Sequence, residues 1–253
     1  MACSPGLEPI CETLAEEGFV DLAVEKFDLE SPGATTGLVD GRQVDAWITW
    51  DPAGPISNFD LDAPVWGTPV TVGSSPLLVA SHRDLPPACR DAAPTWSCVV
   101  GTDQVMALGT PSTIDGLLRA EPIAAALQPD RDFIGSTELG PLRALYEGRN
   151  SVPGPMMKEL ATINPGFYDS IVVTKAGAAV RSVSDTATPA GGFAMTLVVT
   201  PHVDASIDWI GGAFDDDAVR AAVRSAGVEP GEGTLADEKR AGELHALRQE
   251  IAP

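Results

Sequence analysis

Apolar and polar residues along the chain alternate between short strand-like runs and longer patterns with helical spacing. Apolar side chains recur at intervals of three or four residues from Leu7 to Leu14, which predicts a helix that ends near Glu17. Ser4 is a candidate cap for this helix. Residues 1–3 are short and apolar, so the chain is predicted to open as strand, turn and helix.

The remaining apolar runs predict an alternation of strands and helices over the rest of the chain. Predicted strands cover residues 1–3, 19–27, 44–50, 65–72, 76–81, 105–108, 167–174 and 193–200. Predicted helices begin at Thr113 and Lys175 or cover residues 138–147, 155–161, 207–211, 216–226 and 235–251. Pro122 is predicted to break the helix from Thr113, because the residue before a proline disfavours helical geometry.

This order of elements predicts an α/β protein of two lobes, each a mainly parallel sheet flanked by helices. Residues 1–81 with 193–253 are assigned to lobe 1, and residues 82–192 to lobe 2. The chain would then cross twice between lobes. Residues 81–84 and 182–192 are polar or contain glycine, which makes them the candidate hinges.

The charge of the chain narrows the class of partner. The 253 residues carry 36 Asp and Glu against 16 Lys and Arg, a formal net charge of -20. Nucleic acids and anionic lipid surfaces both require clusters of basic residues, so neither is expected as a partner. No apolar run is long enough to cross a bilayer. The abundance of Ala, Gly, Pro, Asp and Arg favours a GC-rich, actinobacterial source.

The four cysteines are Cys3, Cys11, Cys89 and Cys98. An even number fits an oxidising compartment. Cys89 and Cys98 flank a short Pro-rich loop and are the predicted disulfide, with two buried thiols as the alternative. Cys3 and Cys11 are not expected to pair, because Cys11 lies inside a predicted helix. No Cys/His cluster occurs, so neither a metal nor another cofactor is expected.

Ligands of open α/β sheets bind beyond the carboxyl ends of the strands. The residues at or near such strand ends that carry hydroxyl, indole or charged groups are the predicted ligand-binding residues. They are Ser4, Trp50, Asp51, Ser74, Ser75, Thr110, Ser112, Thr113, Thr174 and Lys175. Hydroxyls and the free amides of a helix start suit a small anion, and a neutral polar molecule could use the same groups.

Several of these hydroxyl groups also have a purely structural interpretation. Ser4 could only cap its helix, and Ser112 could form a capping pair with Asp115. Ser74 and Ser75 could be a plain turn between two strands.

The aromatic and charged candidates have alternatives too. Trp47 is expected in the core of a buried strand, whereas Trp50 could stack on a ligand or simply pack at the rim. Lys175 could pair with an acidic ligand group or remain solvated.

Nothing in the sequence indicates an enzyme. It contains no Gly-x-Ser-x-Gly elbow and no Gly-rich phosphate loop. His82, His202 and His245 are scattered, and no nucleophile with its base is apparent. The acidic run Asp215–Asp217 lacks the spacing of a calcium loop.

Four stretches, taken in order, resemble a known family. They are Ala2-Cys3-Ser4-Pro5 before a helix; Val44-Asp45-Ala46-Trp47-Ile48 with Thr49-Trp50-Asp51-Pro52; Gly73-Ser74-Ser75-Pro76-Leu77-Leu78-Val79-Ala80; and Pro165-Gly166-Phe167-Tyr168-Asp169 through Val173-Thr174-Lys175-Ala176, then Pro189-Ala190-Gly191-Gly192. Their order is similar to the type 2 periplasmic-binding-protein family, which includes molybdate-binding proteins. It is most similar to solute-binding domains of actinobacterial envelope proteins, some joined to a von Willebrand factor type A domain.

The resemblance implies an extracytoplasmic protein that closes by a hinge on a small molecule or anion. An ABC-type membrane transporter or an envelope protein would be its partner. The chain starts without a charged and apolar leader, so this interpretation requires a leader that is absent from the sequence.

Two other functions fit the sequence. One is the effector-binding domain of a cytoplasmic regulator of the LysR type, which shares the fold and needs no leader. The other is a module that docks a partner protein, suggested by the Pro-rich segment 85–95.

Overall fold

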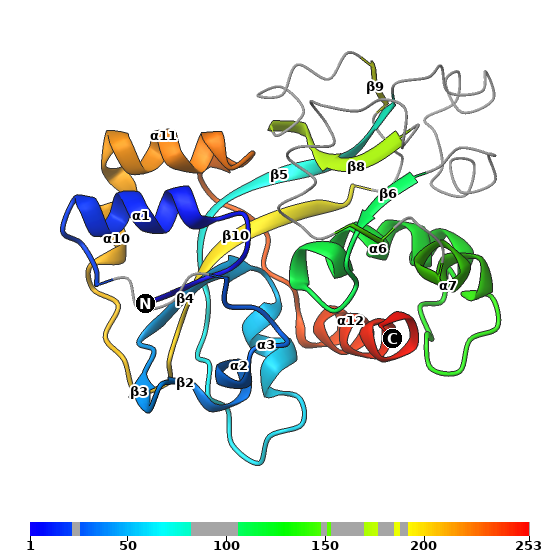
Figure 1. The fold of residues 1–253 in the computed structure, drawn as a ribbon, viewed down its shortest axis with the longest axis horizontal. Coiled ribbons are helices and arrows are strands. Elements are labelled where there is room, and N and C mark those ends of the chain that lie inside the picture. The colour runs from blue at the N-terminus through cyan, green and yellow to red at the C-terminus, as the bar shows by residue number, and fades with distance from the viewer. Residues whose placement is uncertain are drawn as a thin grey trace. The chain divides into compact units, whose positions relative to one another are not determined.

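The computed structural model describes residues 1–21, 26–81, 106–147, 151–152, 170–176, 185–187 and 192–252. The chain divides into two compact units (Figure 1). Unit 1 comprises Met1–Ser75 with Met195–Gly242, and unit 2 comprises Pro76–Ala194 with Glu243–Pro253. The lobe boundaries expected from the sequence stay a prediction, and most residues of the candidate hinges lie outside the described ranges.

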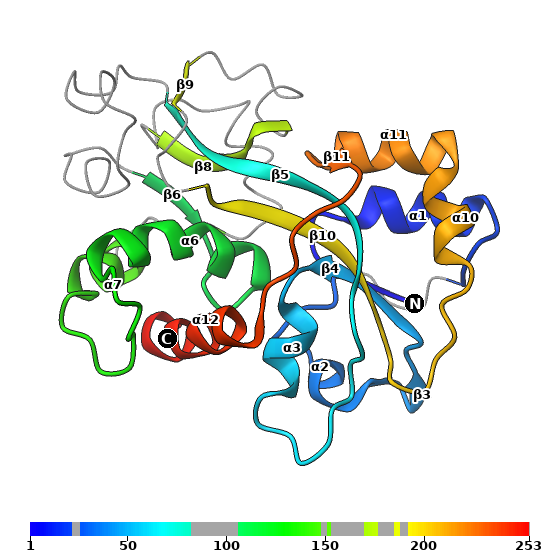
Figure 2. The same ribbon diagram turned by 180° about the vertical axis from the view of Figure 1, so that it is seen from behind.

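The sheet of unit 1 is built from segments far apart in the sequence. β1 (Ala2–Cys3) runs parallel to β4 (Ala46–Trp50), and β4 pairs antiparallel with β10 (Ala194–Pro201). β5 (Val70–Ser81) lies beyond β10, and β11 (Glu229–Pro230) pairs antiparallel with it (Figure 2). The sheet is therefore mixed rather than mainly parallel.

Helices cover both faces of this sheet. α1 (Glu8–Glu16), α10 (Ile210–Asp215) and α11 (Asp217–Ser225) lie on one face, and α2 (Pro32–Thr36) and α3 (Ala53–Asn58) lie on the other (Figures 1 and 2). Every residue of β4 is buried as a result. A small hairpin of β2 (Leu38–Val39) and β3 (Arg42–Gln43) follows α2.

An aromatic cluster fills the core on the α2 and α3 side of unit 1. The ring centroid of Phe27 lies 5.0 Å from that of Trp47 and 6.1 Å from that of Trp66, both in edge-to-face geometry. Trp47 is fully buried, so its predicted place in the core is confirmed. Aromatic pairs of this kind stabilise a fold by about 0.5–1.5 kcal/mol each, beyond the area that they bury.

Unit 2 is built around the second half of β5. β8 (Ser170–Thr174) and β9 (Asp185–Ala187) pair antiparallel with β5. β6 (Met106–Gly109) runs parallel to both β8 and β7 (Ser151–Val152). The described helices here are α6 (Ile114–Leu127), α7 (Gly140–Glu147) and most of α12 (Glu238–Ile251).

Two arginines hold the C-terminal part of α12 inside unit 2. Arg131 forms ion pairs with Glu121 of α6 at 2.5 Å and with Glu243 of α12 at 2.6 Å. Arg143 of α7 pairs with Glu250 and donates through its Nε to the Glu250 backbone carbonyl at 3.0 Å. Glu121 is only 1% exposed, so its charge depends on such compensation.

The structure confirms several predicted elements and corrects two strands. The strands expected at 44–50 and 193–200 appear as β4 and β10. Described residues 19–21 and 26–27 form no strand. The expected turn at residues 73–75 is wrong: β5 runs through it, because β11 pairs with Gly73 and Ser74.

Two predicted helix boundaries are also wrong. α1 begins at Glu8, well after the predicted cap Ser4. Pro122 lies inside a continuous α6, where its missing N–H costs one backbone hydrogen bond. The ring of Pro122 and its neighbours Glu121 and Ile123 are all buried, so tertiary packing outweighs the local penalty. The helix expected at 155–161 lies outside the described residues.

Candidate functional site

The predicted ligand-binding residues fall into two groups of five, one in each unit. Unit 1 holds Ser4, Trp50, Asp51, Ser74 and Ser75; unit 2 holds Thr110, Ser112, Thr113, Thr174 and Lys175. Within unit 1, Ser4, Trp50 and Asp51 lie together at the carboxyl ends of the parallel pair β1 and β4. This is the edge where the strand-end rule predicts a ligand.

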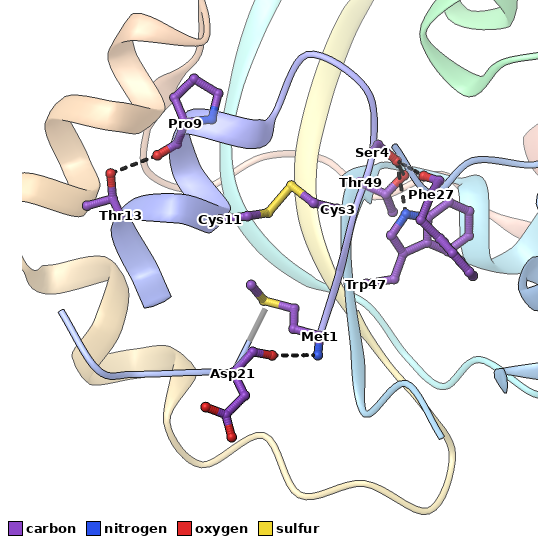
Figure 3. Close-up of a disulfide and its surroundings, with 10 residues drawn as sticks. All are labelled: Met1, Cys3, Ser4, Pro9, Cys11, Thr13, Asp21, Phe27, Trp47 and Thr49. Carbon is purple, nitrogen blue, oxygen red and sulfur yellow. Dashed lines mark hydrogen bonds between the residues drawn. A yellow bond between two sulfur atoms is a disulfide. The ribbon is translucent and has the colours of Figure 1, made fainter. Parts of the chain in front are cut away.

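The hydroxyl of Ser4 is already committed to the core of unit 1 (Figure 3). Its Oγ accepts a hydrogen bond from Trp47 Nε1 at 2.9 Å, and lies 2.8 Å from Thr49 Oγ1 and 3.1 Å from the Phe27 carbonyl. A serine hydroxyl has one donor and two acceptor positions, so these three partners use it fully. The alternative in which Ser4 caps α1 is wrong, since the cap position is Leu7 and has no side-chain hydrogen bond.

Asp51 fastens a distant segment across the strand ends. Its carboxylate is 2% exposed and accepts a hydrogen bond from the Ala236 backbone N–H at 2.5 Å. On the neighbouring strand β10, Thr196 Oγ1 donates to the Thr234 carbonyl at 3.1 Å. The segment from β11 to α12 therefore crosses the ends of β4 and β10 (Figure 2). Sequence reasoning missed this segment, which carries no motif.

Ser74 and Ser75 lie within β5 rather than in a turn. Ser74 pairs with Glu229 of β11, and Ser75 is fully buried. A Cβ added at Gly233 would lie 3.3 Å from the Ser74 Cβ, so the crossing segment passes close above the serine. Ser74 thus lies near the crossing segment, a neighbour that the local sequence did not indicate.

Trp50 differs from the other buried tryptophans of unit 1. Its side chain is 4% exposed, so its ring offers almost no surface for stacking. Trp47 Nε1 donates to Ser4 Oγ at 2.9 Å and Trp66 Nε1 donates to the Ala34 carbonyl at 2.6 Å. Within the described structure, the buried Nε1 of Trp50 has no acceptor. Buried indole N–H groups are normally paired, so Trp50 stands out chemically.

In unit 2, the cap of α6 is Thr113 rather than Ser112. Thr113 Oγ1 accepts from Gly116 N at 3.2 Å and donates to the Thr110 carbonyl at 2.8 Å. A Cβ on Gly116 would lie 2.0 Å from that carbonyl oxygen, so only glycine allows this close approach. The capping pair expected between Ser112 and Asp115 is wrong.

Asp115 binds an arginine that sequence reasoning did not single out. Arg119 donates to the two Asp115 carboxylate oxygens at 2.7 and 2.8 Å and to the Val172 carbonyl of β8 at 2.5 Å. At the end of β8, Thr174 is 4% exposed and Lys175 is exposed. Asp115 and Arg119 are four residues apart in a predicted helix, and this spacing could have indicated their ion pair from the sequence.

The structure contains the disulfide Cys3–Cys11, which the sequence argument did not expect (Figure 3). It joins β1 to α1 with a Cα–Cα distance of 6.3 Å, and both cysteines are fully buried. A helical Cys11 is no obstacle, because α1 packs back along β1 and presents Cys11 to the strand. The predicted pair Cys89–Cys98 lies outside the described residues.

The described residues were compared with the patterns of a metal-binding cluster and of a membrane-spanning helix. No group of three or more His, Cys, Asp or Glu among them is arranged to hold a metal ion. No helix in the described ranges is both long and apolar enough to cross a bilayer.

Comparison with known proteins identifies the fold. No family model matches the sequence, and no curated protein does. An ABC transporter structure from Clostridium perfringens is 12% identical, with a TM-score of 0.56 over 100% of this chain and 99% of that one. A reduced form of OxyR from N. meningitidis is also 12% identical, with a TM-score of 0.55 over 91% and 97%. The periplasmic molybdate-binding protein of Azotobacter vinelandii is 13% identical, with a TM-score of 0.50 over 91% and 98%.

These likenesses establish an α/β fold of the type 2 periplasmic-binding-protein class, as the sequence predicted. The same fold serves solute-binding proteins and the domains of regulators.

Proposed function

We propose that this chain is a small-ligand-binding domain that works outside the cytoplasm as a solute-binding or ligand-sensing protein. The observation that carries the proposal is a buried donor, Trp50 Nε1, at the carboxyl end of β4, which has no acceptor among the described residues of a protein of this fold. An ABC-type transporter or an envelope protein of an actinobacterial cell would be its partner. No enzymatic step is part of the proposal.

In this proposal the ligand acts by shifting a conformational equilibrium. A two-lobed protein that binds a solute more tightly in its closed state is driven towards that state by the difference in affinity. The strand-end residues of both units supply candidate contacts, although Ser4 and Asp51 already have intramolecular partners. The ligand would therefore use Trp50 rather than these two residues of unit 1.

The disulfide Cys3–Cys11 supports the extracytoplasmic assignment. Structural disulfides form and persist in oxidising compartments and are rare in the cytosol of mesophiles. The net charge of -20 favours a protein whose copies repel one another and stay in solution. The same charge disfavours nucleic acid as a partner.

A second candidate is the effector-binding domain of a LysR-type regulator, favoured by the likeness to OxyR. The two candidates differ in redox state. The test is to isolate the protein from its native cells with free thiols alkylated and then to count the thiols that were free. In a protein from outside the cytoplasm, Cys3 and Cys11 should be joined by a disulfide and escape alkylation. In a cytoplasmic regulator, both should react with the alkylating agent after denaturation.

The test of ligand binding is native mass spectrometry, followed by a thermal-shift screen of sugars, amino acids, oxyanions and short peptides. A ligand that binds only the native state stabilises it by about 2.7 kcal/mol at a hundredfold excess over its Kd. A bound mass or a clear shift supports the proposal. Absence of both over the whole panel rejects it in favour of a module that docks a partner protein.

A further inference from the structure

The free donor of Trp50 points to the chemical class of the ligand, an inference that rests on the proposed function. We infer that Trp50 orients the ligand by donating its Nε1–H to an uncharged acceptor, a carbonyl or hydroxyl oxygen of a neutral solute such as a sugar or polyol. Trp47 and Trp66 provide the internal comparison, because both spend the same group on protein acceptors.

The register of β4 shows which face Trp50 occupies. Cys3 of β1 pairs with Ile48 of β4, and Cys3 is bonded to Cys11 of α1, so Ile48 is on the face that α1 covers. Residues two apart in a strand share a face, which places Trp50 on the same side as Ile48. Trp47 and Thr49 alternate to the opposite face, where both meet Ser4.

Trp50 lies two residues beyond Ile48, the residue of β4 that pairs with Cys3 of the disulfide. The Ser4 amide donates to the Ile48 carbonyl at 2.9 Å, after which the chain leaves β1 through a turn at Pro5 and Gly6. Trp50 is therefore beside the corner where β1 turns into α1. Gly6 has a φ of 86°, and a Cβ added there would meet nothing within 4 Å. The turn at Gly6 therefore leaves open space beside this corner, from which an acceptor atom would have to reach the buried indole.

The start of α1 is poorly suited to an anion. The Leu7, Ile10 and Cys11 amides already donate to carbonyls at 3.0–3.3 Å, and Pro9 has no N–H. The first turn also carries the carboxylate of Glu8, which offsets the positive end of the helix dipole. The usual ability of a helix start to bind phosphate or sulfate is thus largely removed here.

The charges of the surrounding segments lead to the same conclusion. Segments 1–11, 44–58, 192–201 and 228–237 supply the strand ends at this edge and the segment that crosses them, and they contain six carboxylates and no Lys or Arg. Arg220 and Arg224 belong to α11, on the same face of the sheet as α1. An anion at the strand ends would lose its hydration without gaining a cation from the four segments. A neutral oxygen needs only a donor, and Trp50 Nε1 is a donor only.

The experiment uses the intact protein labelled with 15N at its indole nitrogens, together with isothermal titration calorimetry. The uncharged probes are glucose, maltose and myo-inositol, and the anionic probes are sulfate, phosphate, molybdate and citrate. Trp50→Phe is the test variant. Trp209→Phe is the control, because Trp209 lies in a different element, before α10, and is partly exposed.

We expect an uncharged probe to move the Trp50 Nε1–H signal downfield while the Trp47 and Trp66 signals stay in place. Trp50→Phe should raise the Kd for that probe by roughly tenfold, the effect of one lost neutral hydrogen bond, and Trp209→Phe should not. The NMR shift does not depend on the variant, so it decides the question even if Trp50→Phe folds poorly.

Other outcomes overturn the inference in distinguishable ways. A probe that binds without moving the Trp50 signal, and equally to Trp50→Phe, overturns the role of Trp50 and leaves the proposed function standing. Binding of an anion through Trp50, with the neutral probes inactive, overturns the ligand class alone. No binding of any probe, together with no bound mass in the purified protein, overturns the function and the inference together.

Discussion

The carboxylate of Asp51 accepts a hydrogen bond from the backbone N–H of Ala236, 185 residues further along the chain, at 2.5 Å. This contact ties the segment between β11 and α12 to the end of β4. Asp51 was a candidate ligand residue by sequence, yet its carboxylate has a structural partner. Its neighbour Trp50 has no acceptor for its indole N–H in the part of the chain that the structure describes.

Removing this contact should destabilise unit 1. Asp51→Ala would leave the Ala236 N–H without its charged acceptor in a partly buried place, at a cost of about 1–3 kcal/mol. Urea unfolding, followed by circular dichroism, measures the loss. Thr196→Val removes the neighbouring bond to the Thr234 carbonyl and should cost about 1 kcal/mol. Wild-type stability in Asp51→Ala would show that the bond contributes nothing.

The disulfide between β1 and α1 should stabilise the protein through the small loop that it closes. Cys3 and Cys11 are eight residues apart, and the chain-entropy model gives about 2.5 kcal/mol for a loop of this size. The double variant Cys3→Ala with Cys11→Ala should lose this amount in urea unfolding.

The redox dependence supplies the control for the disulfide. Reducing agent should lower the stability of the wild-type protein and have a smaller effect on the double variant. An equal effect on both would show that Cys3–Cys11 is not the disulfide that responds. Mass mapping of alkylated peptides would then identify the cysteines involved.

Arg131 should be essential to the packing of α6 and α12. Arg131→Ala removes a cation from Glu121, which is only 1% exposed, and we expect a loss of about 3–5 kcal/mol. Adding Glu121→Gln should restore part of the stability, because the uncompensated buried charge is then gone. The free energy of unfolding is measured for both single variants and for the double variant. If the loss in the double variant equals the sum of the two single losses, the residues are not coupled.

The C-terminal helix should respond to acid through Glu250. The Gly135 N–H, which donates to Glu250 Oε1 at 2.6 Å, and the Arg143 guanidinium lower the pKa of this carboxyl below its ordinary value of 4.5. The ionised form is therefore the one that the folded state favours. Its contribution is fully present above pH 4.5 and is lost as the pH falls through the lowered pKa.

Glu250→Gln should remove this part of the pH dependence. We expect its stability to fall less steeply than that of the wild type when urea unfolding is repeated from pH 6 down to acid conditions. A variant at an exposed carboxylate with no hydrogen-bond partner in the described structure, Glu12→Gln, serves as the control. Parallel pH profiles for wild type and Glu250→Gln would contradict the assignment.

The sequence by itself determined the α/β class, the buried strand that became β4 and the core position of Trp47. Local patterns carry this information, because alternation and helical spacing reflect which side of an element is buried. The same patterns placed Ser4, Trp50 and Asp51 at strand ends. They did not show which of these groups would still be available to a ligand.

Only the tertiary structure decided that question. β5 continues through Gly73 because β11 supplies a partner from more than 150 residues away, and the disulfide forms because α1 folds back on β1. Pairing between distant segments depends on the closure of long loops, which no local pattern records. Among the described residues Ser4 and Asp51 have hydrogen-bond partners and the Trp50 indole has none, and that difference exists only once the chain is folded.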